Sequence, residues 1–224
     1  MNLLLTLISI EIKSILRNRY LNQTFFINLG ASLIGFYYLT HRPNQGIGME
    51  IYWILLLVAL PAMLLTPFFF TKDGNIFQAL LSRNIPLEFY ILGKILPTIL
   101  FSILYYIGMF LVIFQRDQIL IGTFAAAIIY YLAFGLILLT LYSSYDNNKI
   151  DLSRTPMFNY QGYSFIKILL LIPIPTPLLF WDETRKIGIG LMAFLGLLGL
   201  LFFRFSINCI VKNIEKRKYI FSNL

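Results

Sequence analysis

The sequence contains little cysteine and little charge, and it lacks a phosphate-binding loop. A single cysteine, Cys209, excludes a disulfide framework and a multi-cysteine metal site. No G-x-x-x-x-G-K-[ST] segment occurs, so the chain cannot bind ATP by that route. Only 12% of the residues are charged and 58% are hydrophobic, and the mean hydropathy is +0.77. A soluble protein needs more charge on its surface, so the composition predicts a membrane protein.

Apolar runs recur along the chain at a length that suits a membrane span. A helix needs about 20 mostly apolar residues to cross the hydrocarbon core of a bilayer. The predicted spans are Thr24–Thr40, Ile51–Phe70, Ile95–Phe114, Ile119–Tyr142, Ile166–Trp181 and Ile187–Ser206. The sequence therefore predicts an all-α integral membrane protein with six transmembrane helices, in a single domain that covers residues 1–224. The last residues, 207–224, are predicted to form a tail.

The distribution of lysine and arginine predicts the orientation. With a cytoplasmic N-terminus, fourteen of these residues fall in inside segments, and the other four, Arg42, Arg116, Arg185 and Lys186, fall outside. Cytoplasmic loops carry the excess of positive charge, so both termini are predicted to be cytoplasmic. The net charge of +8 is then a signal of topology and of attraction to anionic membrane lipid. It does not indicate a nucleic-acid partner.

Residues 1–20 predict an amphipathic helix that lies in the membrane interface. On a helical wheel the apolar residues share one face and the polar residues share another. The apolar face comprises Leu4, Leu5, Ile8, Ile12, Ile15 and Leu16, and the polar face comprises Thr6, Ser9, Lys13 and Arg17. Such a helix places its apolar face in the acyl chains and its cations toward the headgroups. A first span that begins early is the alternative.

Residues 71–94 form a polar, basic segment between the second and third predicted spans. Within the sequence TKDGNIFQALLSRNIPLEFYILGK, Ile76–Leu81 has the pattern of a short amphipathic helix. Ile85 and Pro86 follow it, and proline interrupts a helix because it lacks a backbone donor. The segment is therefore predicted to present a short helix to a soluble partner.

This order of elements resembles the permeases of type-2 ATP-binding-cassette (ABC) exporters. That family combines an amphipathic N-terminal helix, six spans and a coupling helix between the second and third spans. The matching residues are Asp73-Gly74, Phe77, Leu80-Leu81, Ser82-Arg83-Asn84-Ile85-Pro86 and Tyr90-Ile91-Leu92-Gly93-Lys94. The stretches 145–152 and 158–162 also resemble a poorly characterised branch of such permeases.

The resemblance implies a transport subunit rather than an enzyme. A separate ABC ATPase subunit would bind ATP and Mg²⁺ and hydrolyse the ATP, so this chain would hold no cofactor. The coupling helix would sit in a groove of that ATPase, with apolar anchors at the centre and charges at the rim. The residues implied in that contact are Gly74, Phe77, Leu80, Leu81, Arg83 and Glu88. The cargo would be apolar or amphipathic, and the membrane would be the bacterial cytoplasmic (inner) membrane.

The resemblance also implies a dimer, either of two copies or with a related permease. Ala31 and Gly35 in the first predicted span are small residues four apart, a spacing that lets two helices approach closely. They suit a dimer interface, and packing within one protomer is an equally open interpretation.

Two loops depart from the better-known members of this family. The outer loop Asp182–Lys186 is shorter than in many relatives, and the second cytoplasmic loop, residues 143–165, is longer. Two alternatives to the exporter interpretation stay open. One is a haem-exporter-like permease of cytochrome maturation, and the other is a membrane scaffold or immunity protein that transports nothing.

Overall fold

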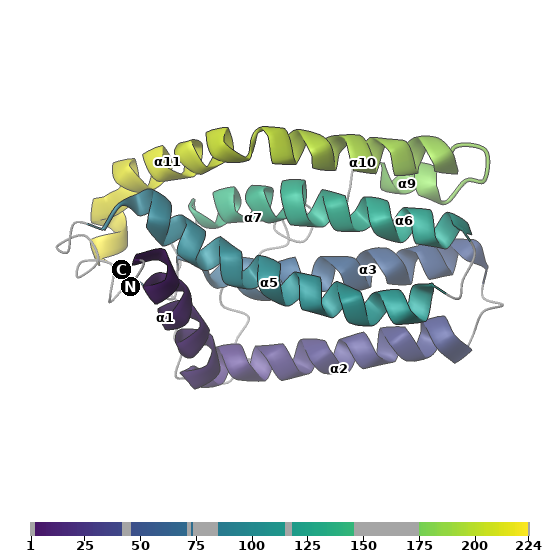
Figure 1. Cartoon of the computed structure of the whole chain (residues 1–224), viewed down its shortest axis with the longest axis horizontal. Helices are drawn as coiled ribbons and strands as arrows, with labels where there is room; N and C mark the ends of the chain where they lie inside the picture. Colours follow the sequence, from purple (N-terminus) through teal and green to yellow (C-terminus); the bar gives the residue numbers. More distant parts are fainter. Residues whose placement is uncertain are drawn as a thin grey trace.

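The described part of the chain is helical. The computed structural model describes residues 3–41, 46–70, 73, 85–114, 118–145 and 175–223, and no strand occurs among them. The long helices lie side by side in one bundle (Figure 1). The all-α prediction is confirmed for these residues.

The elements follow one another up and down the bundle. In order they are α1 (Leu3–Arg17), α2 (Arg19–His41), α3 (Ile47–Leu65), η2 (Thr66–Phe68), α5 (Leu87–Ile113), α6 (Gln118–Ile129), the π-helical segment η4 (Tyr130–Gly135), α7 (Leu136–Ser143), α9 (Thr176–Leu179), α10 (Arg185–Leu201) and α11 (Phe203–Asn223). The short helix α1 runs at a steep angle to the others across one end of the bundle, and the end of α11 lies at that same end (Figure 1).

Some of the described helices are long and apolar enough to cross a membrane. Two qualify outright, Leu87–Leu111 and Gln118–Ser143. The pair Arg185–Leu201 and Phe203–Lys216 makes a third if it counts as one span, although it bends by 63°. Ile47–Met63 is apolar but shorter. The described residues therefore show a protein with two or three span-length apolar helices, and the fifth predicted span lies mostly outside them.

Helix α5 begins earlier than the predicted third span. The chain enters it at Pro86, and Leu87 is its first residue. Proline is favourable at a helix start, where its missing N–H is not needed. Gly93 and Lys94, which the sequence placed in a loop, consequently lie in the second turn of a helix, and Lys94 is buried.

Helix α10 packs backbone against backbone on the fourth predicted span. A Cβ on Gly196 would lie 2.7 Å from the carbonyl carbon of Ile129, and one on Gly199 would lie 2.7 Å from the backbone nitrogen of Phe134. Only glycine permits this approach. The contact falls on the π-helical segment η4 and the turn before it, where the regular hydrogen-bond pattern of the helix changes.

We expect Gly199→Ala to lower the melting temperature of the detergent-solubilised protein. Overpacking a close contact costs about 1–3 kcal/mol, whereas alanine gains only about 1 kcal/mol over glycine in helix propensity. Gly190 on the same helix has open space around it, so Gly190→Ala should leave the melting temperature unchanged or raise it. Equal melting temperatures for the two variants would contradict the close contact.

Candidate functional site

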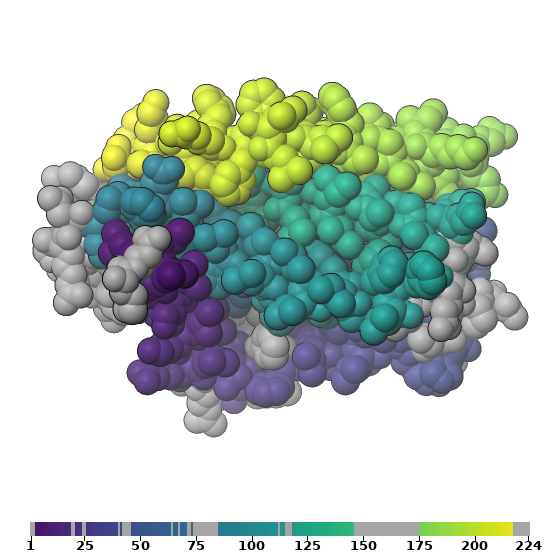
Figure 2. All heavy atoms as spheres, in the orientation of Figure 1, coloured from purple at the N-terminus to yellow at the C-terminus, as the bar shows by residue number. Residues whose placement is uncertain are grey.

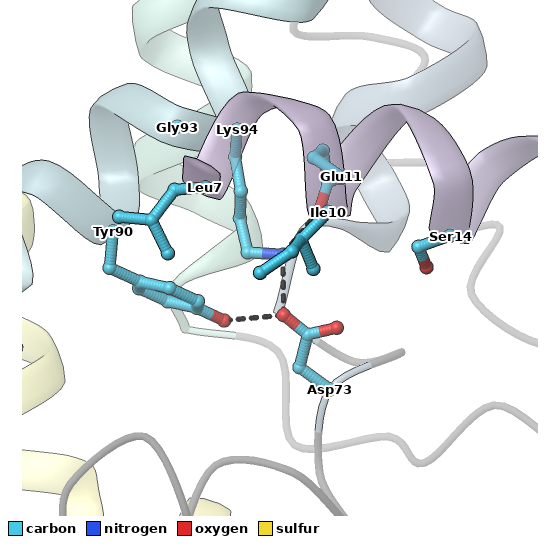
Figure 3. Close-up of a pocket in the computed structure, with 8 residues that line it drawn as sticks. All are labelled: Leu7, Ile10, Glu11, Ser14, Asp73, Tyr90, Gly93 and Lys94. Carbon is cyan, nitrogen blue, oxygen red and sulfur yellow. Dashed lines mark hydrogen bonds and ion pairs between the residues drawn. The ribbon is translucent and has the colours of Figure 1, made fainter. Parts of the chain in front are cut away.

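A cluster of buried charges joins three segments of the chain at the end of the bundle where α1 lies. The Nζ of Lys94 is 2.5 Å from Oδ2 of Asp73 and 3.3 Å from Oε2 of Glu11. The hydroxyl of Tyr90 donates a hydrogen bond to the same Asp73 oxygen at 2.7 Å. The Lys94 ammonium also lies 4.9 Å from the centre of the Tyr90 ring. We call Glu11, Asp73, Tyr90 and Lys94 the ion cluster (Figure 3).

The ion cluster is shielded from its surroundings. Lys94 is 2% exposed and Glu11 is 7% exposed, and the Asp73 side chain is 14% exposed. Removing such groups from water costs several kcal/mol each, and close opposite charges with added hydrogen bonds offset this cost. Each charge is therefore tolerated because the others are present, so the three segments depend on one another.

A glycine next to Lys94 allows α1 to reach the ion cluster. A Cβ on Gly93 would lie 2.9 Å from the Cβ of Leu7, so a larger residue would push α1 away from α5. Leu7 and Glu11 are one turn apart and are the buried residues of α1. One face of α1 thus combines an apolar contact with a charged one, and both are directed at the second turn of α5.

The corner between α1 and α2 is held by a separate apolar contact. Leu21 and Phe68 are each 1% exposed and pack together, with Ile15 of α1 against them. The Asn18 side chain accepts a hydrogen bond from the backbone N–H of Leu21 at 3.4 Å. Phe68 ends η2, and Asp73 follows five residues later. The corner therefore holds the C-terminal end of α1, and the ion cluster holds the middle of this helix.

A cavity of about 90 Å³ opens beside the charged groups. Its lining is Leu7, Ile10, Glu11, Ser14, Asp73, Tyr90, Gly93 and Lys94 (Figure 3). This volume is large enough for several water molecules. No group of three or more metal-ligating side chains occurs in the part of the chain that the structure describes. The ion pairs of Lys94 with Asp73 and Glu11 can hold the three segments together electrostatically.

Most of the residues of the predicted coupling helix have no described position. Gly74, Phe77, Leu80, Leu81 and Arg83 lie outside the described residues. Glu88 lies in the first turn of α5 and is exposed. A carboxylate there is favourable because the N-terminus of a helix carries partial positive charge.

The predicted dimer residues lie on α2. Ala31 is half-buried and Gly35 is buried. A Cβ on Gly35 would lie 2.9 Å from Cδ2 of Leu57 on α3, so this glycine serves a contact within the chain. Its role in a dimer stays a prediction.

The sequence interpretation missed Glu11 as a site residue. It placed Asp73 and Lys94 in a loop and gave Glu11 no partner. A usable signal was present, because Glu11 is the only acidic residue among the first 49 and it stands between two isoleucines. An isolated acid in an otherwise apolar and basic helix indicates a charged partner elsewhere.

The chain belongs to a protein family described as "Family of unknown function (DUF5687)", whose model matches residues 3–223. No curated protein and no solved structure matches the chain.

We expect Lys94→Met to destabilise the protein strongly. It would leave Glu11 and Asp73 buried without their cation, a change that typically costs about 3–5 kcal/mol. Adding Asp73→Asn should recover part of the lost melting temperature, because one uncompensated charge is removed. Lys212→Met is the matched control, since Lys212 is exposed on α11. If Lys212→Met and Lys94→Met lower the melting temperature equally, the ion cluster is not a stabilising element.

Proposed function

We propose that this chain is the permease subunit of an ABC exporter that moves an apolar or amphipathic cargo. A separate ATPase subunit would bind and hydrolyse ATP, and two permease subunits would form the translocation path. The observation that carries the proposal is the ion pair between Asp73 and Lys94, together with the Tyr90–Asp73 hydrogen bond. These contacts join the two ends of the segment that contains the predicted coupling helix.

The contacts of Asp73 with α5 fix the two ends of the segment that contains the predicted coupling helix. Asp73 precedes residues 74–84, and α5 begins at Leu87 just after them. Because Asp73 is bonded to the second turn of α5, a displacement of residues 74–84 must act on α5 directly. Glu11 adds α1 to the same contacts. Rigid helices that move together are how small displacements at a partner become larger movements elsewhere.

Six spans with both termini cytoplasmic belong to the proposal. Helices α2, α3, α5, α6–α7 and α10 overlap five of the six predicted runs, and two or three of the described helices are long and apolar enough to cross a membrane. The start of α5 and the end of α11 lie at the α1 end of the bundle (Figure 1). The basic segments around these elements favour that end as the cytoplasmic one. The bacterial cytoplasmic membrane is the proposed location.

The coupling helix can be tested by replacing its apolar anchors. Phe77→Ala with Leu81→Ala is expected to reduce the co-purified ATPase at least tenfold, because two buried anchors can contribute about 2–4 kcal/mol to a groove contact. The measurement is the molar ratio of phosphate-loop ATPase to tagged permease after purification from native membranes in mild detergent. Retained ATPase and retained transport would favour the scaffold interpretation instead.

A matched control separates loss of binding from loss of folding. Leu111→Ala with Phe114→Ala removes the same side-chain types at the far end of α5, where both are exposed. This variant should keep the ATPase at the wild-type ratio. Melting temperatures of both variants should stay close to that of the wild type.

Cysteine labelling tests the topology in a Cys209→Ala background. Cysteines at Gly74 and Asn147 should react with a membrane-impermeant reagent only from the cytoplasmic side, and a cysteine at Ile47 only from outside. Ile47 is chosen because it is exposed, whereas the neighbouring Gly46 has a φ of 90° that disfavours other residues. Labelling of Asn147 from outside would remove the six-span topology.

A further inference from the structure

We infer that α1 is a docking surface for anionic phospholipid, and that lipid bound there stabilises the ion cluster. The surface consists of Leu5, Ile12 and Leu16 with Lys13 and Arg17, and we call it the lipid face. This inference concerns α1 and the bilayer alone and does not rest on the proposed ATPase partner.

Burial of Glu11 sets the sign of charge on the lipid face. Glu11 is the only acidic residue of α1, and it is turned inward onto Lys94. The charged residues that α1 exposes are Lys13 and Arg17. Each basic residue near a bilayer attracts anionic headgroups, and neutral headgroups offer no such attraction. The ion cluster thereby makes α1 selective for phosphodiester headgroups that carry net negative charge.

The geometry of α1 suits a bilayer surface. Leu5 is 60% exposed and Leu16 is 65% exposed, so an apolar strip lies uncovered next to the two cations. Helix α1 crosses the end of the bundle at a steep angle to the span-length helices (Figure 1), and it lies on the surface of the molecule (Figure 2). A helix across the ends of membrane-spanning helices lies near the headgroup level, where apolar strips and cations both find partners.

The opposite face of α1 connects lipid binding to α5. Leu7 contacts Gly93, and Glu11 contacts Lys94. A lipid that holds α1 in place therefore keeps Glu11 within reach of Lys94 and favours the closed ion cluster. By linkage, anything that binds only the docked form of α1 stabilises that form.

Hydrogen exchange on the full chain in nanodiscs tests the lipid face. With equal parts phosphatidylcholine and phosphatidylglycerol, the α1 amides should exchange more slowly than in phosphatidylcholine alone. In the mixed-lipid discs, Lys13→Gln with Arg17→Gln should speed the exchange of the α1 amides by roughly tenfold or more. Lys212→Gln with Lys216→Gln removes two exposed cations of the same spacing from α11 and should leave the protection of α1 intact. Inorganic phosphate added to phosphatidylcholine discs should have no effect.

Two results of the exchange experiment would contradict lipid binding at α1. Equal exchange of α1 in the two lipids, or an equal loss of protection in the α11 control, would show that α1 is not a specific lipid surface. The coupling is tested by Glu11→Gln, which keeps the shape of the side chain and the Asp73–Lys94 pair. In this variant phosphatidylglycerol should still protect α1 but should no longer protect the first two turns of α5. Unchanged protection of those turns would refute the coupling.

Discussion

The buried ammonium of Lys94 is the constraint on which this end of the protein depends. A charge within a span-length helix is costly unless charged partners reach it, and here the partners come from two other segments. Glu11 comes from a helix that crosses the bundle, and Asp73 comes from the start of the segment before α5. The position of α1, the position of Asp73 and the second turn of α5 are therefore parts of one electrostatic arrangement.

The two sides of the bundle are held by different physical means. Helix α10 meets the π-helical segment by backbone contact at Gly196 and Gly199, a contact that depends on shape and changes little with solution conditions. Helix α1 meets α5 through charges as well as through packing, and charge interactions respond to neighbouring charges and to the dielectric of their surroundings. Of the two contacts, the contact of α1 with α5 is therefore the one that neighbouring charges can strengthen or weaken.

Local patterns in the sequence were enough to predict the helical class and α1. The apolar runs are long and continuous, and the predicted interfacial segment, residues 1–20, contains the observed helix Leu3–Arg17. The Glu11–Lys94 contact could not be predicted in this way. A hydropathy scale scores every lysine as polar, so Lys94 was assigned to the loop before the third predicted span. The π-helical segment was missed for a related reason, since its residues Tyr130–Gly135 are as apolar as their α-helical neighbours. Partners far apart in sequence leave no periodic signal.

The distance along the chain between Glu11 and Lys94 has a consequence for biosynthesis. The two residues are 83 positions apart, and a chain emerges from the ribosome N-terminus first. Helix α1 is thus made long before its cationic partner exists, and during that interval Glu11 remains accessible to water. Docking of α1 onto Lys94 must wait until α5 has been translated. The ion cluster consequently forms late, and only after the chain up to Lys94 has been synthesised.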